Sequence, residues 1–524
     1  MTPTASPTQN KPGRTVWLAA GLITVAALFL HGWLLFHAGA FCGDEVQVIN
    51  LAGTHSLSAM THDSFPVLLP LLVSGWTAIG LAGSDCNLRL LGLLIGWGML
   101  GALWLPAWTA RRGLPVLSLI FFGLNGTAIF WTDYLRAYGL GSLLILLALA
   151  AMLFLLAKPT WPRAGCLAVV AVLSVQALYQ NAVFVAGISL GGWLVCWLRK
   201  DKNAAIKIFA AALLAAISLL PYLESVLNWQ RATVIRPGFS IKAVLDNLDT
   251  VLAFPLPQYV WIWVLLGLTV IGLGSVNLFQ PKPSVQSENR MTTAELQVFA
   301  GTILFSALIG YFVFLHFAAL ITSPWYFLPL MALAAVCFDL GISLSMLPRP
   351  VCTVVWGILI ATVVIAIPFA ARDLNCRFSN MDLVASRLLN EASPQDYVVV
   401  TPWHLGISFN RYYHGAAAWD TLPPVADHST YRFDLVPTSA TEKARAMQPV
   451  LDRIANTLQN GHRVWIAGWM SVPAPGRTAA TEEGRLLAEH SRSFEAVDLK
   501  IKGQISDYEN VSLLRAGGWK TNSP

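Results

Sequence analysis

Ionisable side chains at the ends of long apolar segments are the residues of this sequence best suited to do chemistry. They are Asp44, Glu45, His62, Asp63, Asp133, Arg136 and Glu224. An ionisable group at membrane depth costs several kcal/mol unless it faces polar surroundings, so each of them is a candidate functional residue. The alternative for any single one is a side chain that simply reaches water at the end of its segment.

A carboxylate and a guanidinium can divide the work of a group-transfer reaction. A carboxylate such as that of Asp44 can take the proton of an incoming hydroxyl as a general base. A guanidinium such as that of Arg136 can hold a phosphate through two parallel N–H bonds. Together they suit transfer from a phosphate-linked donor to a hydroxyl or an amine. They are equally compatible with a proton-coupled transporter, in which carboxylates relay protons.

The composition indicates which elements must position these residues. Of the 524 residues, 56% are hydrophobic and 12% are charged, and the mean hydropathy is +0.59. A soluble domain carries about 25% charged residues, so the sequence predicts a polytopic α-helical membrane protein. The net charge of +6 is spread along the chain rather than clustered, so it does not indicate nucleic acid as a partner.

The hydropathy pattern predicts eleven transmembrane helices. They cover residues 16–36, 88–108, 114–131, 137–157, 164–180, 182–198, 208–228, 257–278, 297–320, 325–346 and 351–371. Alternate connections are short and rich in Lys and Arg, which is typical of cytoplasmic loops. We therefore expect a cytoplasmic N-terminal tail at 1–15, a transmembrane domain at 16–371 and an external, periplasmic domain at 372–524. The candidate residues then all fall on the external side, where a shared cavity would explain their clustering.

Two loops on that external side should contribute to a site. The first, residues 37–87, includes a segment at 61–80 that mixes Asp, Ser and Pro with apolar residues. This mixture predicts a helix that lies along the membrane surface rather than a span. The second loop, residues 229–256, contributes Arg231 and Arg236.

The stretch after the last span has an ordinary, water-soluble composition. Residues 396–402 and 462–470 are rich in β-branched and aromatic residues and predict buried strands. Between them, residues 441–460 carry apolar side chains at helical spacing, and Gly461 is placed as the C-cap of that helix. We predict a small external α/β domain. The segment TPWHLGISFNRYYHG of this domain contains His404 and His414. A catalytic role for either histidine is one alternative, and the favoured one is a loop that packs aromatic side chains over the membrane domain.

Seven cysteines occur without a Cys-x-x-Cys spacing, so they predict no metal site. Cys42, Cys86 and Cys376 fall on the external side of the predicted topology. A Cys42–Cys86 disulfide is one alternative there and free thiols are the other, because a sequence alone cannot pair cysteines.

The order of these motifs resembles the GT-C superfamily of membrane glycosyltransferases, especially the protein O-mannosyltransferases and the lipid A aminoarabinose transferases. The matching pieces are GDE after the first span, HDSFPVLLPLL, DYLRAYGLGSLLILLALA and PWYFLPLMALAA, in this order within residues 16–371. Three pieces depart from the pattern. One of the two prolines expected after His-Asp is absent, since Phe65 precedes Pro66. The acid before Arg136 is Asp133, three residues away, where many bacterial members have a Glu two residues away. LYQNAVF has Gln180 and Asn181 where a histidine is expected, which puts in doubt any metal or base role of that histidine.

The resemblance implies an enzyme of the bacterial inner membrane that transfers a sugar from a polyprenyl-phosphate donor, with inversion at the sugar carbon. The acceptor would be a lipid, a glycan or a protein, and membrane lipids are further partners. Asp44 would be the general base, with Glu45 in support. Implied ligands of the donor phosphate are Arg136, Arg231 and Arg236. Implied substrate-lining residues are His62, Asp63, Asp133, Tyr138 and Tyr326. The resemblance requires no resident cofactor beyond the lipid-linked co-substrate and is compatible with a divalent metal.

Two alternatives stay open at this point. One is an enzyme of the same fold that moves a different group. The other is a secondary transporter or lipid flippase. Such transporters often consist of two repeated halves, and this sequence shows no such internal symmetry.

Overall fold

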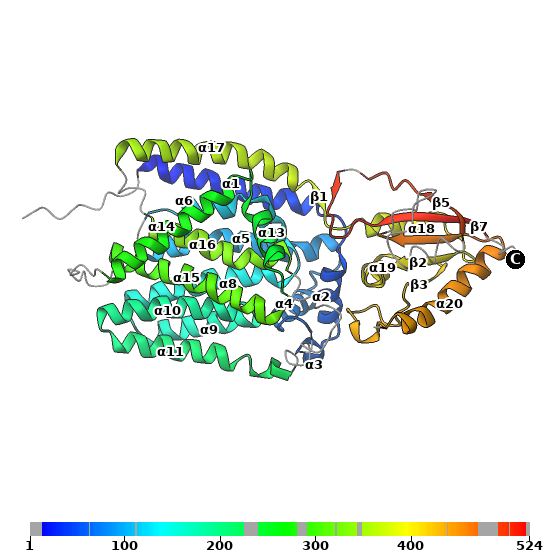
Figure 1. Ribbon diagram of the computed structural model, residues 1–524, viewed down its shortest axis with the longest axis horizontal. Coiled ribbons are helices and arrows are strands. Elements are labelled where there is room, and N and C mark those ends of the chain that lie inside the picture. Colours follow the sequence, from blue (N-terminus) through cyan, green and yellow to red (C-terminus); the bar gives the residue numbers. More distant parts are fainter. Residues whose placement is uncertain are drawn as a thin grey trace, which may run out of the picture.

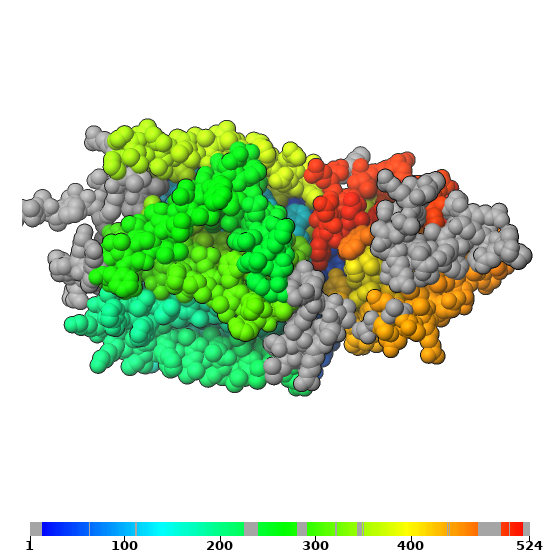
Figure 2. Space-filling model, in the orientation of Figure 1, coloured from blue at the N-terminus to red at the C-terminus, as the bar shows by residue number. Residues whose placement is uncertain are grey.

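The computed structural model describes residues 13–61, 63–110, 113–224, 239–279, 291–319, 322–342, 348–437, 439–469, 491–501 and 503–519. Figure 1 shows a bundle of long, roughly aligned helices with a smaller domain at one end. The first loop lies at the junction between these two parts, where α2 is labelled (Figure 1). Figure 2 shows the C-terminal segment, in red, reaching back to this end of the bundle.

The bundle is built from the apolar segments of the sequence. Nine helices among the described residues are long and apolar enough to cross a membrane. They are α1 (Arg14–His37), α5 (Asp85–Ala110), α8 (Ala137–Ala157), α10 (Asn181–Arg199), α11 (Lys202–Ile217), α14 (Tyr259–Phe279), α15 (Thr293–Ala318), α16 (Leu328–Gly341) and α17 (Arg349–Asp373). The spans of α11 and α16 include the adjoining 3-10 turns η2 (Leu220–Tyr222) and η4 (Pro324–Phe327). Each of the eleven predicted spans overlaps a helix, and the fifth is the shorter α9 (Trp161–Ala177). The chain is therefore an integral membrane protein.

The third predicted span is broken rather than straight. It consists of α6 (Val116–Ser118), the π-helical turn η1 (Leu119–Gly123) and α7 (Gly126–Asp133), and the two halves are bent by 74°. The break occurs because Asn125 adopts an extended backbone and its side chain accepts a hydrogen bond from the N–H of Ala128. An asparagine in this geometry starts a new helix. The bend brings the end of α7 to the junction with the first loop.

Three short helices make up the first loop. They are α2 (Gly43–Gly53), α3 (Leu57–Thr61) and α4 (Leu68–Ala78). The helix predicted within residues 61–80 is thus confirmed as α4. Helix α2 lies at the end of the bundle that faces the C-terminal domain (Figure 1).

The C-terminal domain has the predicted α/β character. Its five-stranded sheet has the order β3-β2-β4-β7-β5, in which β2 is parallel to β3 and β4, and β7 is antiparallel to β4 and β5. The strands are β2 (Tyr397–Thr401), β3 (Ala418–Thr421), β4 (Val464–Gly468), β5 (Ser491–Ala496) and β7 (Ser512–Trp519). Strands β2 and β4 are the two strands predicted from the sequence.

Helices cover both faces of this sheet. Alternate residues of β2 point to opposite faces, so Val398 and Val400 pack with the cluster of α18 (Met381–Glu391) and α19 (Gly406–Tyr412), while Val399 packs with that of α20 (Ala440–Gln459). Helix α20 is the helix predicted at 441–460. The glycine that follows it, Gly461, has φ +79°, as a helix C-cap glycine should.

Polar contacts join the C-terminal domain to the first loop. The N–H of Phe378 donates to the carbonyl of Ala38 at 2.8 Å. On the other side of the junction, Arg411 and Tyr412 both donate to Asp85 at 2.6 Å. The short strands β1 (Cys376–Arg377) and β6 (Gln504–Ile505) pair in parallel beside these contacts. The last part of the chain is thereby held against this end of the bundle.

Candidate active site

The first turn of α2 presents the two acids of the GDE motif in different directions. Cys42 is the N-cap, and the Glu45 side chain returns to the Cys42 N–H at 3.2 Å in a capping box. Neighbouring helix positions point about 100° apart. Asp44 and Glu45 therefore face different surroundings although they are adjacent in the sequence.

Glu45 points into the protein and is fully buried. Its Oε1 accepts from Arg89 Nη1 at 3.2 Å and from the N–H of Leu135 at 3.1 Å. Arg89 also donates to the carbonyl of Ala40 at 2.8 Å and lies over the Phe41 ring. Burial raises the pKa of the Glu45 carboxyl, and the charge of Arg89 opposes that rise. Glu45 thus ties α2 to α5 and to the segment before α8.

Asp44 points toward the junction, and its side chain is 13% exposed. Its Oδ1 accepts from Arg136 Nη2 at 3.1 Å, and its Oδ2 accepts from the Tyr508 hydroxyl at 2.7 Å. The two partners, Arg136 and Tyr508, lie far apart in the sequence. The carboxylate is held by both oxygens, and each oxygen keeps a lone pair for a further donor.

Arg136 is buried, yet only part of its guanidinium is used. Among the described residues, its Nε and Nη1 have no hydrogen-bond partner. Its Cζ lies 4.6 Å from the centre of the Phe65 ring. Burial lowers the pKa of Arg136, but the nearby carboxylates of Asp44 and Asp63 outweigh this and raise it above its ordinary value. Buried N–H groups are rarely left unpaired, so these two donors mark a position suited to an anion.

Asp63 lies beside this arginine and is also only half satisfied. Its Oδ1 accepts from Gln47 Nε2 at 2.5 Å. Within the described part of the chain, Asp63 Oδ2 and Gln47 Oε1 have no donor. Burial raises the pKa of Asp63, and the charge of Arg136 opposes this. Two acceptor oxygens and two N–H donors, all buried and all unpaired, therefore gather near Asp44.

Aromatic side chains close one side of this polar cluster. The rings of Phe65 and Tyr138 meet edge to face at 5.6 Å, and those of Tyr138 and Tyr326 at 5.4 Å. The carbonyl of Tyr326 accepts from Gln180 Nε2 at 2.9 Å and from the Tyr311 hydroxyl at 2.7 Å. Gln180, which stands near the expected histidine, therefore fixes the backbone of a residue that lines the cluster.

Comparison with solved structures identifies this architecture. The sequence matches no protein-family model and no curated protein sequence. ArnT from Cupriavidus metallidurans, crystallised with undecaprenyl phosphate, superposes with a TM-score of 0.51 at 12% identity, covering 96% of this chain and 98% of ArnT. An oligosaccharyltransferase from Archaeoglobus fulgidus, in complex with Zn and sulfate, gives a TM-score of 0.51 at 12% identity, covering 93% of this chain and 72% of that one. Both neighbours are GT-C superfamily members. This chain has the GT-C fold.

The remaining predicted residues occupy several places in the GT-C fold. Asp133 faces α1 and pairs with His31, with 2.7 Å between Oδ1 and Nδ1. The structure thus brings Asp44, Asp63, Arg136, Tyr138 and Tyr326 together, whereas Asp133 is engaged with the bundle. Three predicted residues lie outside the described residues: His62, Arg231 and Arg236.

The Cys42–Cys86 disulfide is not formed. Cys42 is a buried free thiol and Cys86 is an exposed one. The Cys42 Sγ contacts the Tyr134 hydroxyl at 2.7 Å. Burial raises the pKa of the Cys42 thiol. Cys42 is therefore a packing residue at the start of α2 rather than a reactive group.

The C-terminal domain contributes two site residues that the sequence did not reveal. Tyr508 reaches Asp44, and Glu509 Oε2 accepts from the Gly43 N–H at 2.7 Å. Glu509 is buried, and burial raises its pKa to about 7. The hydrogen bond between Tyr508 and Asp44 spans 464 residues. No local pattern in SDYEN predicts such a contact.

The described residues were also tested for a metal site. They contain no group of three or more His, Cys, Asp or Glu side chains that could hold an ion. Within the described part of the cluster, Asp44 has an arginine and a tyrosine as its neighbours, and Asp63 has one carboxylate oxygen without a donor. No step of the proposed reaction is assigned to a metal ion.

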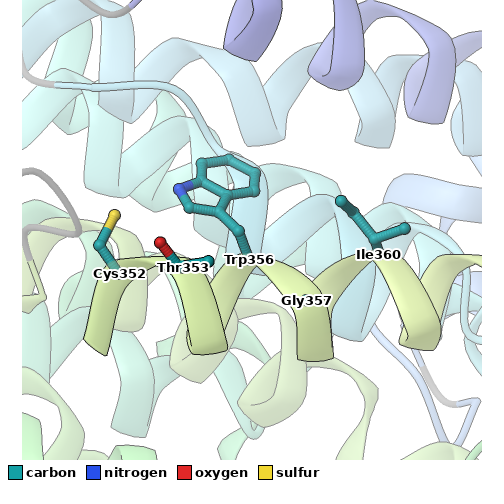
Figure 3. Close-up of a pocket in the computed structure, with 5 residues that line it drawn as sticks. All are labelled: Cys352, Thr353, Trp356, Gly357 and Ile360. Carbon is teal, nitrogen blue, oxygen red and sulfur yellow. The ribbon is translucent and has the colours of Figure 1, made fainter. Parts of the chain in front are cut away.

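A separate groove lies on α17 (Figure 3). It has a volume of about 580 Å³ and is lined by Cys352, Thr353, Trp356, Gly357 and Ile360. These residues belong to the first half of α17, whereas Asp373, the last residue of that helix, precedes β1 at the junction. The groove is apolar and distant from Asp44, so it is not part of the candidate site.

Proposed function

We propose that this protein is a membrane glycosyltransferase that moves a sugar from a polyprenyl-phosphate donor to a lipid, glycan or protein acceptor. The observation that carries the proposal is the Asp44–Arg136 pair, in which a carboxylate adjoins a guanidinium with two unpaired N–H groups. A base and an anion site at hydrogen-bond distance suit transfer from a phosphate-linked donor. The GT-C neighbour ArnT is crystallised with undecaprenyl phosphate, which supports a donor of this class.

The reaction is a single displacement. Asp44 accepts the proton of the acceptor hydroxyl or amine as that atom bonds to the anomeric carbon of the sugar. The bond between this carbon and the phosphate oxygen breaks, and its electron pair leaves with the polyprenyl phosphate. The added negative charge develops beside Arg136, where fixed donors stabilise it. Attack opposite to the leaving group inverts the configuration at the sugar carbon.

Other residues take supporting roles in this scheme. The free oxygens of Asp63 and Gln47 accept hydrogen bonds from the sugar, and Tyr138 and Tyr326 cover it. Glu45 holds the helix that carries Asp44. Outside the described residues, Arg231 and Arg236 remain candidates for the phosphate and His62 for the sugar. Asp133 supports the end of α7 through His31.

The orientation follows from the basic connections of the sequence. We place the N-terminus in the cytoplasm and the C-terminal domain in the periplasm of a bacterial inner membrane. Nucleotide sugars are scarce there, which favours a lipid-linked donor.

The test uses the purified protein with an undecaprenyl-phosphate-linked sugar and candidate acceptors. Asp44→Asn should lower turnover by about 10²- to 10⁴-fold, because it removes the base. Asp246→Asn is the matched control, since Asp246 is an exposed aspartate paired with Lys242 on α13 (Ile241–Leu252). Unchanged turnover of Asp44→Asn would exclude the base. Solute uptake by proteoliposomes without any glycosylated product would instead identify a transporter.

A further inference from the structure

Two consecutive residues of the C-terminal domain, Tyr508 and Glu509, form hydrogen bonds with two consecutive residues of the first loop. The Tyr508 hydroxyl donates to Asp44 Oδ2 at 2.7 Å, and Glu509 Oε2 accepts from the Gly43 N–H at 2.7 Å. Gly43 and Asp44 form the first turn of α2. The Glu509 contact holds the backbone of that turn, and the Tyr508 contact holds the Asp44 carboxylate.

Glu509 acts as a second N-terminal cap for α2. Glu45 already satisfies the Cys42 N–H, and Glu509 satisfies the next one along the chain. A side-chain oxygen at a helix N-terminus is stabilising because it accepts from a backbone N–H that has no partner within the helix. The other oxygen of Glu509 accepts from the Ser379 hydroxyl at 2.7 Å, so the cap is itself held in place.

The approach of the C-terminal domain depends on the glycine at position 43. A Cβ atom there would lie 2.7 Å from the Tyr431 hydroxyl, which is too close for a real contact. The GDE motif thus fits against the C-terminal domain at Gly43 as well as at Asp44.

Tyr508 is packed so that its hydroxyl has one direction. Its ring meets Trp325 edge to face at 5.1 Å and Trp131 at 6.0 Å. Because Arg136 holds Oδ1 of Asp44 and Tyr508 holds Oδ2, the plane of the carboxylate is fixed. A general base must lie within hydrogen-bond reach of the proton it removes, and small misplacements are costly.

We propose that Tyr508 and Glu509 are positioning residues for Asp44, so that the C-terminal domain completes the active site. The inference rests on the proposed function for the role of Asp44. The contacts themselves can be tested without any reaction.

Tyr508→Phe removes the hydroxyl and leaves the packing of the ring. We expect kcat to fall by about 10- to 100-fold, with an unchanged KM for the lipid-linked donor, whose phosphate is held by Arg136. The control is Tyr397→Phe, because Tyr397 makes an equivalent 2.7 Å bond to Asp420 within the C-terminal domain. In an Asp44→Asn background, Tyr508→Phe should cause no further loss.

Glu509 is tested by a pair of substitutions. Glu509→Ala should lower kcat and speed hydrogen–deuterium exchange of a peptide covering residues 42–48. Glu509→Gln should restore both toward the wild type, since its amide oxygen can still accept from the Gly43 N–H. Glu495→Gln, at an exposed pair with Arg515 in the same domain, is the control.

The outcomes separate the two proposals. Faster exchange in Glu509→Ala together with lower kcat supports the positioning role. Faster exchange in a protein whose wild type transfers no sugar still supports the contact, and it refutes the glycosyltransferase instead. Unchanged exchange and unchanged kcat in both Glu509→Ala and Tyr508→Phe would overturn the positioning role.

Discussion

Asp44 and Arg136 are joined by an ion pair of 3.1 Å that links the first loop to the start of α8, 92 residues away. Each side chain of the pair stabilises the other. The guanidinium holds one carboxylate oxygen, and the carboxylate orients the guanidinium so that its Nε and Nη1 have no partner among the described residues. Removal of either partner therefore has two effects, on the charge of the site and on its geometry.

Substitution of Arg136 should separate charge from geometry. Arg136→Lys keeps a positive charge but loses the planar fork, so we expect weaker binding of undecaprenyl phosphate, by about tenfold (about 1.4 kcal/mol). Arg136→Ala should weaken binding further. Equilibrium binding of the lipid phosphate to the purified protein measures both. Arg432→Lys, at an exposed cluster of the C-terminal domain, is the control. Equal affinity in all variants would remove Arg136 from the phosphate site.

The buried Glu45–Arg89 pair should matter for stability more than for binding. Loss of one partner of a buried ion pair leaves an uncompensated charge and costs about 3–5 kcal/mol. We expect Arg89→Ala to lower the midpoint of thermal unfolding clearly. Lys242→Ala, which breaks an exposed pair, should leave it unchanged. Similar midpoints for the two variants would show that Arg89 does not hold the loop.

The carboxyl of Glu509 should make stability depend on pH. Its pKa is raised from 4.5 to about 7 by burial, and the charge of Asp44 adds to the rise, while Gly43 and the serines 379 and 408 oppose it. The folded state therefore holds this proton more tightly than the unfolded state. The stability that it contributes is complete below about pH 4.5 and is lost as the pH rises through about 7.

Unfolding midpoints measured between pH 4.5 and 8 test this dependence. Glu509→Gln cannot ionise, so its midpoint should change less over that interval than the midpoint of the wild type. Identical pH profiles for the two proteins would contradict the assignment to Glu509.

A glycine of α5 should be intolerant of any side chain. A Cβ at Gly96 would collide with Asp133 Oδ1 and would lie 2.5 Å from His31 Nδ1. Gly96→Ala should therefore disturb the His31–Asp133 pair and destabilise the protein by about 1–3 kcal/mol. Gly101→Ala on the same helix is the control, because a Cβ there meets nothing within 4 Å. Thermal unfolding of the two variants measures the difference, and equal midpoints would contradict it.

The cysteines of the first loop offer a test of topology and of folding. A membrane-impermeant maleimide added to intact spheroplasts should label the exposed Cys86 and should not label the buried Cys42. Because Cys376 is a second, partly exposed thiol on the proposed external side, the comparison is made in a Cys376→Ser background. There Cys86→Ser should abolish the signal, and Cys42 should react only after unfolding. Labelling of Cys86 only after the membrane is opened would reverse the proposed orientation.

Much of this architecture could be predicted from local patterns. Apolar runs locate the spans, and strand and helix periodicities locate β2, β4 and α20, because these signals depend on nearby residues. The broken third span follows from Asn125, a single capping residue inside an apolar run. A single polar residue barely changes a hydropathy average over a whole span, so the hydropathy pattern does not predict the break.

The candidate site was less accessible to prediction. Asp44, Asp63 and Arg136 are polar residues at apolar edges, so their cost in a membrane singles them out. Asp133 is also a polar residue at the edge of an apolar segment, but its partner is His31 on α1. Whether Asp133 contacts α1 or the polar cluster depends on how α7 bends, which the sequence does not show. Tyr508 and Glu509 lie in an ordinary soluble stretch, where acids and tyrosines carry no such cost and give no signal.

The Gly43–Glu509 hydrogen bond joins residues that are 466 positions apart. On the ribosome, Glu509 is made roughly 20 to 90 seconds after Gly43, at 5–20 residues per second. Throughout that interval α2 lacks its second cap and Asp44 lacks the tyrosine that fixes its plane. A nascent chain can therefore insert its helices long before the site around Asp44 is complete, and the proposed activity would arrive as one of the last events of biosynthesis.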